Sequence, residues 1–329
     1  MQLPLLSIVI VSFNTRELLR RCLLSVFDNP AHRIPEAWAA ATYGPAQLQS
    51  PSTPEPIPIE LLVVDNDSKD GSAEMVSEQF PGVRLIRLGA NAGFARASNA
   101  GLRESRGELL LLLNPDTELL DSALVQMAGF LTTHPSVGAV GPALVYPDGR
   151  HQHAAFRFPT LWMSLFDFFP MNHQLIDSRL NGRYPIRGGD TPFPIDHPLG
   201  AAIMMKRETL EEVGLLDEAF FMYCEEIDWC MRAKRSGWQI YQVPSARVIH
   251  HAAQSSRQFR EKMLVELHKS RYRLFRKHYS PAFVAAHRAI TRLGIAREIA
   301  RARWQAHRGQ ISRDELERRL WAYHTIWSL

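Results

Sequence analysis

Four short apolar runs, each followed by polar residues, constrain the fold of this chain most strongly. The runs begin at Leu5, Ile59, Val83 and Glu108, and segments with helical patterns separate them. Continuous apolar strands that alternate with helices indicate a parallel sheet covered on both faces. The carboxyl ends of such strands meet at one edge, where ligands bind. We therefore predict an α/β fold with a mostly parallel sheet and a ligand site in the loops after its strands.

Carboxylates gather at this predicted edge. Asp65, Asp67 and Asp70 follow the second run, and Asp116 follows the fourth. Carboxylates that share an edge repel each other unless they bind a cation or accept hydrogen bonds from a ligand. Each aspartate taken alone is also explained as a turn residue or a helix cap. Four of them at strand ends favour a binding site.

Five motifs occur in order along the chain: residues 11–14 (VSFN), 64–72 (VDNDSKDGS), 91–99 (NAGFARASN), 113–116 (LNPD) and 220–228 (FFMYCEEID). Together they resemble the inverting family 2 glycosyltransferases of the GT-A fold, especially bacterial rhamnosyltransferases of O-antigen and cell-wall polysaccharide synthesis. The resemblance covers roughly residues 5–256. It implies a Rossmann-like sheet and transfer of a sugar, with rhamnose as one candidate, from a dTDP- or UDP-sugar. The acceptor would be a hydroxyl of a saccharide or lipid-linked saccharide.

The resemblance also implies roles for single residues in donor binding. Asp65 would accept a hydrogen bond from the N–H of the pyrimidine ring, a task that suits an acceptor-only carboxylate. Asp116 would hold Mg²⁺ or Mn²⁺ on the donor diphosphate, and His250, at an apparent strand end, would complete the metal site. The other residues expected to bind the donor are Ser12, Asn14, Ser68, Asp70, Asn91, Gly93, Phe94, Asn99 and Asn114.

Two adjacent acids, Glu225 and Glu226, open a helical stretch, where acidic residues also stabilise the helix dipole. In the resembling family the second acid of this motif, usually Asp, is the general base. It matches Glu226 here, and Glu225 is the competing candidate. Near the acceptor we expect the small residues Gly200 and Ala201, together with Asp228. An arginine four residues after Asp228 favours a structural ion pair for that aspartate.

The C-terminal region is basic and predicted to be helical. Residues 257–329 contain 17 Lys and Arg against 6 Asp and Glu, whereas residues 1–256 contain 21 against 28. Ser280–Pro281 and a capping box at Ser312 predict helix starts. After the second start, Leu316, Leu320, Tyr323 and Trp327 form an apolar stripe. We expect a catalytic domain over residues 1–256, with a proline-rich insertion at about residues 30–58, and a basic amphipathic region over 257–329.

Three partners suit such a basic region: an anionic membrane surface, a second copy of the chain, or RNA. Because acceptors in the resembling family are often lipid-linked, we favour the membrane, with a homodimer next and no nucleic acid. The chain has no run near the roughly 18 apolar residues of a spanning helix. It has three cysteines and no CxxC pair. We therefore expect a cytoplasmic protein, peripheral on the inner face of the cytoplasmic membrane.

Other functions fit the sequence less well. A nucleotidyltransferase needs a glycine-rich phosphate loop near the first strand, and residues 11–16 contain no glycine. Neither GxGxxG nor GxxxxGK[ST] occurs, which argues against a dehydrogenase and a P-loop NTPase. A non-catalytic sugar- or nucleic-acid-binding protein would not require the acidic cluster near residue 225.

Overall fold

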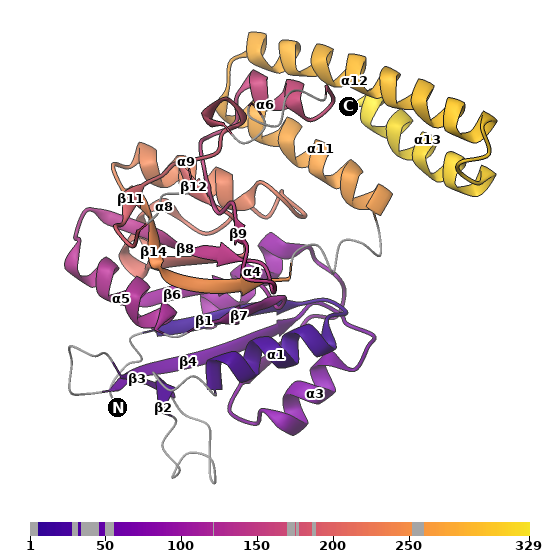
Figure 1. The fold of residues 1–329 in the computed structure, drawn as a ribbon. Helices are drawn as coiled ribbons and strands as arrows, with labels where there is room; N and C mark the ends of the chain where they lie inside the picture. Colours follow the sequence, from indigo (N-terminus) through magenta and orange to yellow (C-terminus); the bar gives the residue numbers. More distant parts are fainter. Residues whose placement is uncertain are drawn as a thin grey trace.

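The structure is a computed structural model. It describes residues 6–27, 32–33, 46–49, 56–120, 122–169, 175, 178–185, 189–251 and 260–329. A mixed sheet forms its centre, helices cover both faces of that sheet, and a group of C-terminal helices stacks on one side of this body (Figure 1). The predicted α/β fold is confirmed.

Parallel strands form one half of the sheet. The strand β1 (Leu6–Ser12) lies between β4 (Pro56–Asp65) and β6 (Leu109–Leu113), and β5 (Arg84–Arg87) pairs with β4. The helices between them are α1 (Arg16–Phe27), α3 (Ser72–Gln79) and α4 (Phe94–Glu104). In the register of β1 and β4, Ser12 lies opposite Asp65. The loops after both strands therefore begin at the same edge of the sheet, as predicted.

Both faces of β1 are buried, which explains its continuous apolar sequence. Ile8 and Ile10 pack with Leu19 of α1 on one face, whereas Val9 packs with Ala97 of α4 on the other. Successive side chains of a strand point to opposite faces, so a strand between two helical layers needs apolar residues at every position. Each fully buried aliphatic side chain of this kind contributes about 1.5–3 kcal/mol.

The other half of the sheet brings further segments to the same edge. The strand β13 (Ala202–Lys206) is antiparallel to both β6 and β8 (Val137–Val145). The strand β14 (Gln239–His250) is parallel to β8, and β7 (Thr117–Leu119) pairs with its end, so that Thr117 lies opposite His250. The flanking helices are α5 (Ala123–Thr133), α8 (Arg207–Val213) and α9 (Glu225–Arg235).

Short elements complete the body. The strands β2 (His32–Arg33) and β3 (Ala46–Gln49) extend the sheet beyond β4, while the centre of the predicted proline-rich insertion lies outside the described residues. The remaining short elements are β9 (His151–Gln152), β10 (Ala155–Phe156), α6 (Leu161–Phe166), the 3-10 helix η1 (Arg179–Asn181), β11 (Phe193–Pro194) and β12 (His197–Pro198).

The C-terminal region is helical, as predicted. It contains α11 (Arg260–His278), α12 (Pro281–His307) and α13 (Arg313–Ser328). Ser280 accepts a hydrogen bond from the Phe283 N–H at 3.3 Å, and Ser312 accepts one from the Glu315 N–H at 3.1 Å. These are the N-caps that the sequence indicated.

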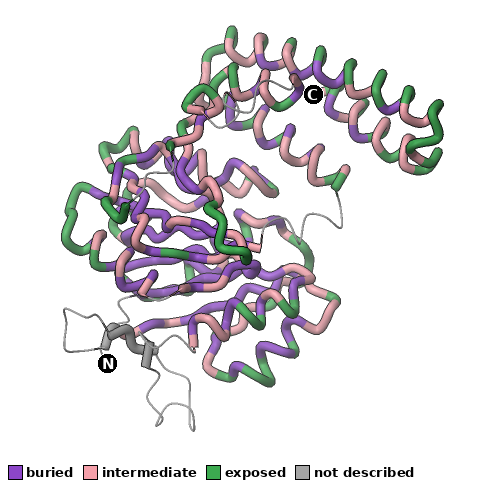
Figure 2. Tube along the Cα trace, viewed as in Figure 1, coloured by how far each residue is buried: buried purple, intermediate pink, exposed green. Residues whose placement is uncertain are grey.

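The predicted apolar stripe of α13 is only partly correct. The inward face is centred on Ala322 and Ile326, which are buried with Tyr323 against α11 and α12. Leu316 and Leu320 are half-buried, and Trp327 is exposed (Figure 2). The periodicity located an amphipathic helix, but the buried face is fixed by neighbouring helices, which a single-helix pattern does not reveal.

The C-terminal helices pack directly against the catalytic body. Leu274 and Phe275 of α11 are buried in one cluster with Phe220, Cys224 and Met231, which precede or belong to α9. The predicted boundary near residue 256 lies outside the described residues, and it stays a prediction. The buried cluster nevertheless shows that α11 shares a core with the region of the predicted acidic motif.

Candidate active site

Asp65 lies at the end of β4 with one oxygen available to a ligand. The residue is buried, and its Oδ2 accepts a hydrogen bond from the Ser68 N–H at 3.2 Å. Its Oδ1 is also buried and has no hydrogen-bond partner among the described residues. An unsatisfied buried acceptor costs about 1–3 kcal/mol. A ligand N–H that reached this oxygen would remove that cost.

The loops after β1 and β4 hold each other through backbone and side-chain hydrogen bonds. Asn14 has a left-handed backbone, with φ at 53°. Its N–H donates to the Ser68 Oγ at 3.0 Å, and its Oδ1 accepts from the Lys69 N–H at 2.7 Å. At the start of this loop, the Ser12 and Thr15 hydroxyls lie 3.0 Å apart. Asn14 and Ser68 therefore fix the shape of the loops around Asp65.

Asp70 has a similar structural role. Its carboxylate accepts hydrogen bonds from the Arg16 N–H at 2.8 Å and from the Ser72 N–H at 3.0 Å. Partial burial raises the pKa of Asp70, but these hydrogen bonds outweigh it and hold the pKa below its usual value. Asp70 ties the β1–α1 loop to the start of α3.

Asn66, which the sequence analysis did not single out, holds the glycine motif in place. Its Oδ1 accepts from the Ala92 N–H at 2.8 Å, and its Nδ2 donates to the Asn91 Oδ1 at 3.0 Å. Two residues later, Gly93 has φ at 84°. A Cβ there would lie 2.4 Å from the Phe221 carbonyl oxygen, so a larger residue would collide with the fifth motif.

Phe94 continues this contact, because its N–H donates to the same Phe221 carbonyl at 2.7 Å. Motifs three and five, about 130 residues apart in the sequence, are thus in direct backbone contact. The signal for Asn66 was present, since it lies inside the second motif. Phe221 likewise lies inside the fifth motif, but no role was predicted for it.

Asn99, predicted to bind the donor, makes structural contacts, and its role in donor binding stays a prediction. Its side chain is buried in α4, where Nδ2 donates to the Leu216 carbonyl at 2.8 Å and Oδ1 accepts from the Leu216 N–H at 3.1 Å. A further bond joins its Nδ2 to Glu218 at 3.1 Å. Because the amide is fully used by this distant segment, Asn99 joins α4 to the chain before α9.

Asp116 and His250 meet at the end of β14, as the resemblance implied. The His250 Nε2 lies 3.5 Å from the Asp116 Oδ1, and both side chains are buried. The His250 Nδ1 lies 3.0 Å from the Gln152 Oε1. The Gln152 contact orients the imidazole ring so that Nε2 faces Asp116. Nothing in the sequence pointed to Gln152.

Two neighbouring contacts hold this corner. The His251 N–H donates to the Asp116 carbonyl at 2.9 Å, and the Asn114 N–H donates to the Ala201 carbonyl at 2.9 Å. Within the part of the chain that the structure describes, no group of three or more His, Cys, Asp or Glu side chains is arranged to hold a metal ion. Asp116 and His250 are the two predicted metal ligands at this corner.

Glu225 and Glu226 begin α9 after a strained turn. Tyr223 and Cys224 have φ at 69° and 68°, a left-handed conformation that costs non-glycine residues energy and clusters at functional sites. Gly200 lies against Glu226, since a Cβ on the glycine would be 3.3 Å from the Glu226 Cδ. The predicted base and the predicted acceptor segment are therefore in contact.

The two glutamates differ in their protonation. Burial raises the pKa of Glu226 to about 7, so that it ionises near neutral pH. Burial and the adjacent Glu226 charge raise the pKa of Glu225 well above its usual value. One carboxyl oxygen of each is buried and has no hydrogen-bond partner among the described residues. Glu226 can accept a proton at neutral pH, whereas Glu225 stays protonated.

Asp228 does not face an acceptor, which corrects the prediction that it binds one. It is completely buried and pairs with Arg232 at 2.9 Å, Lys277 at 2.8 Å and His278 at 2.6 Å. Burial raises the pKa of Asp228, but its partners outweigh this and hold the pKa below its usual value. The alternative expectation of a structural ion pair with Arg232 is confirmed. Lys277 and His278 of α11 join this pair.

A cavity of about 170 Å³ adjoins Glu226. Its walls include Tyr223, His197, Leu267 and Arg271. Burial lowers the pKa of His197 to about 4, so this side of the cavity is uncharged at neutral pH. The cavity gives Glu226 access to a small polar group that enters between α9 and α11.

The parallel strand ends, the buried acids and the small-residue segment beside them define a glycosyltransferase of the GT-A fold. The sequence matches the family described as Glycosyl transferase family 2 over residues 7–214, and the chain belongs to this family. The resemblance drawn from the five motifs is confirmed.

Several relatives are rhamnosyltransferases. The chain is 30% identical over 254 residues to an N-acetylglucosaminyl-diphospho-decaprenol L-rhamnosyltransferase of Mycobacterium tuberculosis, covering 71% of this chain and 81% of that one. It is 22% identical to the dTDP-rhamnosyl transferase RfbF of Shigella flexneri, over 58% of this chain and 59% of that one.

Solved structures share the fold. A mannosyltransferase from Pyrobaculum calidifontis, in complex with GDP-Man and Mn²⁺, aligns with a TM-score of 0.55 at 15% identity, over 99% of this chain and 86% of that one. A GalNAc-T7 structure with UDP, GalNAc and Mn²⁺ aligns with a TM-score of 0.52 at 18% identity. That alignment covers 76% of this chain but only 44% of the other.

Proposed function

We propose that this enzyme transfers L-rhamnose from dTDP-L-rhamnose to a hydroxyl of a lipid-linked saccharide, with inversion at the anomeric carbon. The observation that carries the proposal is the placement of three groups. The open oxygen of Asp65 and the Asp116–His250 pair follow strands that flank β1 and end at one sheet edge. Glu226 contacts Gly200, whose neighbour Ala201 accepts a hydrogen bond from the Asn114 N–H. The sugar, the donor base and the lipid carrier are suggested by the names of the relatives.

The Asp116–His250 pair fits a divalent cation. The contact between His250 and Gln152 orients Nε2 toward the Asp116 carboxylate, and a carboxylate with an imidazole is a donor set used for Mg²⁺ or Mn²⁺. When bound, such a cation would offset the negative charge that develops on the leaving diphosphate. Asp116 and His250 would hold it.

Glu226 would act as the general base. It would take the proton of the acceptor hydroxyl while the acceptor oxygen bonds to the anomeric carbon and the bond from that carbon to the diphosphate breaks on the opposite face. Gly200 lets the backbone of the predicted acceptor segment lie directly against the Glu226 side chain, since a Cβ there would be 3.3 Å from the Glu226 Cδ. Asp65 would orient the donor through the pyrimidine N–H.

Calorimetry with a panel of nucleotide sugars tests this function directly. We expect dTDP-L-rhamnose to bind in the presence of Mn²⁺ more tightly than UDP-GlcNAc or GDP-mannose, and its affinity to fall in EDTA. Transfer to a lipid-linked saccharide, followed by NMR of the anomeric proton, would show inversion. Preference for another donor would reject the sugar assignment, and a retained anomeric configuration would reject the mechanism.

We also propose that the C-terminal helices bind the surface of an anionic membrane. Two features support this. Residues 257–329 carry 17 Lys and Arg against 6 Asp and Glu. The largest exposed apolar side chains of this region are aromatic, and amphipathic aromatic rings suit the lipid headgroup layer. The exposed aromatic residues on α12 and α13 are Trp304, Trp321 and Trp327, and Leu293 of α12 is exposed as well. Figure 2 shows exposed positions along both helices.

Vesicle flotation tests the membrane proposal. The enzyme should float with phosphatidylglycerol vesicles at low salt and less at high salt, because charge attraction is screened over about 8 Å at physiological ionic strength. Replacing Trp304, Trp321 and Trp327 by Ser should reduce flotation, and equal recovery would reject the proposal. None of the described helices is long and apolar enough to span a bilayer. A homodimer and a cytoplasmic location stay predictions.

A further inference from the structure

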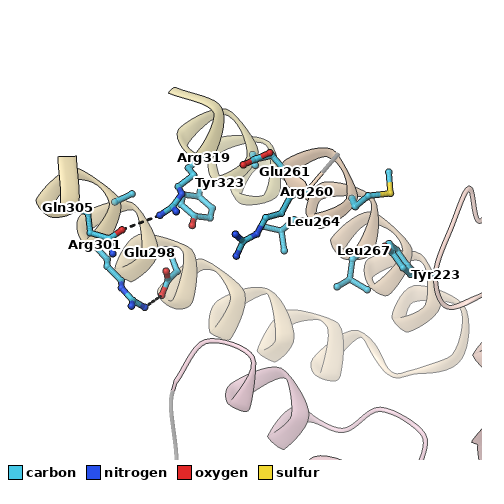
Figure 3. Close-up of a pocket in the computed structure, with 13 residues that line it drawn as sticks. Tyr223, Arg260, Glu261, Leu264, Leu267, Glu298, Arg301, Gln305, Arg319 and Tyr323 are labelled. Atoms are coloured by element: carbon cyan, nitrogen blue, oxygen red, sulfur yellow. Dashed lines mark hydrogen bonds and ion pairs between the residues drawn. The ribbon is translucent and has the colours of Figure 1, made fainter. Parts of the chain in front are cut away.

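A large cavity lies outside the donor edge, among the C-terminal helices. It measures about 820 Å³ and is bordered by α11, α12 and α13 (Figure 3). Its apolar walls include Leu264 and Leu267 of α11, and its floor includes Ala302 and Ala322, whose side chains are too small to fill it. We call this space the helical groove.

The helical groove adjoins the cavity beside Glu226. Tyr223 and Leu267 line both, so these two side chains form a shared wall between the proposed base and the C-terminal helices. Tyr223 is also one of the two strained residues before α9. A ligand whose reactive end lies near Glu226 would therefore leave the active site along α11.

The far end of the helical groove is basic. Arg260, Arg301 and Arg319 line it together with Glu261 and Glu298. Arg301 is neutralised in part by Glu298, 3.9 Å away, and Arg319 pairs with Glu315 at 2.5 Å. Arg260 forms no ion pair with another described residue, and Figure 3 shows its side chain directed into the space between the helices.

Arg260 can still bind an anion from the groove. Arg319, held by the Gln305 Oε1 at 3.1 Å, lies on the opposite helix. Two guanidinium groups that face one space match the oxygens of a phosphate or diphosphate, which arginine binds in a bidentate manner. The Tyr323 hydroxyl feels charges of both signs: burial and the Glu298 charge raise its pKa, and the charges of Arg319, Arg260 and Arg301 lower it by less.

The order of these features along α11 indicates which part of a ligand lies where. Leu267 and Arg260 are seven residues apart, or about 10 Å along a helix. A sugar residue that carries a diphosphate can span that distance. Trp304, in the last turn of α12, and Trp321, in the middle of α13, are exposed and belong to the surface that we propose to face the bilayer.

We propose that the helical groove binds the lipid diphosphate of the acceptor, with the phosphates on Arg260 and Arg319 and the hydrocarbon chain leaving beyond these arginines toward the membrane. This inference rests on the proposed function, in that the acceptor is lipid-linked. The residues that line the groove favour this ligand over others. A free saccharide and a neutral lipid both lack the negative charge that the two arginines would bind.

The test uses the full chain and farnesyl diphosphate as the probe, with binding measured by calorimetry in EDTA so that a metal-dependent donor site does not contribute. Farnesyl diphosphate should bind, whereas inorganic diphosphate and farnesol should each bind much more weakly. Arg260→Glu should weaken farnesyl diphosphate at least about tenfold, since a hydrogen bond to a charged group contributes roughly 1.5–3 kcal/mol.

Arg303→Glu is the matched control. It makes the same charge change on α12, at an exposed residue that does not line the groove, and it should leave binding unchanged. Equal binding by wild type and Arg260→Glu, or equal losses in both variants, would overturn the inference. Equal binding of inorganic diphosphate and farnesyl diphosphate would overturn the lipid part of it.

Donor binding separates this inference from the proposed function. Arg260→Glu should bind dTDP-L-rhamnose with Mn²⁺ as wild type does, because Arg260 is not at the donor edge, and its melting temperature should match that of Arg303→Glu. If wild type fails to bind dTDP-L-rhamnose, the proposed donor is wrong. If wild type binds the donor but Arg260→Glu does not change the affinity for farnesyl diphosphate, only the assignment of the groove is wrong.

Discussion

Glu226→Gln should remove the general base while leaving the shape of the site intact. Burial raises the pKa of Glu226 to about 7, so the carboxylate form is about nine-tenths populated at pH 8 and about one-tenth populated at pH 6. General-base catalysis contributes about 10²- to 10⁴-fold. The full loss should therefore appear at pH 8, and the ratio of wild-type to variant turnover should be about tenfold smaller at pH 6.

The assay is kcat/KM for rhamnosyl transfer, measured from pH 5.5 to 9 for both proteins. Wild-type activity should rise with pH through about 7, because the base works only when it is deprotonated. The variant should lose that limb of the profile and keep its donor affinity. Glu226→Asp should retain part of the activity, since a displacement of one methylene can itself cost about 10²-fold.

Glu225→Gln is the internal control for this experiment. The pKa of Glu225 is raised well above its usual value by burial and by the charge of Glu226, so its side chain is protonated at neutral pH and an amide resembles it. The variant should keep most of its turnover. If Glu225→Gln abolishes transfer while Glu226→Gln retains it, the base is Glu225 and the reasoning from burial is wrong.

Four further outcomes follow from the described contacts. Asp65→Ala should weaken nucleotide binding by about 1–3 kcal/mol in calorimetry, and an unchanged affinity would exclude it from the donor site. Asp116→Ala should make nucleotide diphosphate binding insensitive to Mn²⁺, whereas a persistent metal response would place the metal elsewhere. Gln152→Leu should reduce Mn²⁺ affinity about 10- to 100-fold through the orientation of His250, measured by metal titration of activity. Asp228→Asn should lower the free energy of unfolding by about 3–5 kcal/mol in urea titrations. A much smaller change would mean that water hydrates the partner cations in the variant.

Sequence patterns predicted the residues whose position follows from strand order. Asp65 and Asp116 follow the apolar runs that became β4 and β6, and the two strands flank β1, so both residues reach one edge of the sheet. Ser280 and Ser312 were predicted as caps because a cap depends on only a few neighbouring residues. Local rules were enough in each of these cases.

The contacts that the sequence did not predict join distant segments. Asn99 lies in a family motif, yet its amide bonds to Leu216, 117 positions away. Asp228 was expected to pair within its helix and does, but Lys277 and His278 reach it from α11. Gln152 lies in a two-residue strand with no periodic pattern. Such pairings are set by how helices and hairpins pack, which a single sequence does not encode in a local pattern.

The Asp228 contacts bear on how this enzyme can be divided or recombined. A fragment that ends before α11 would leave a buried carboxylate without Lys277 and His278, and it would expose Phe220 and Met231, which pack on Leu274 and Phe275. A chimera that exchanges the C-terminal helices with those of another family member would need to carry the lysine, the histidine and the apolar pair along with them. The fusion point of such a chimera should therefore lie after α11, in the short connection before α12. The change in charge composition near residue 256 is a less suitable position.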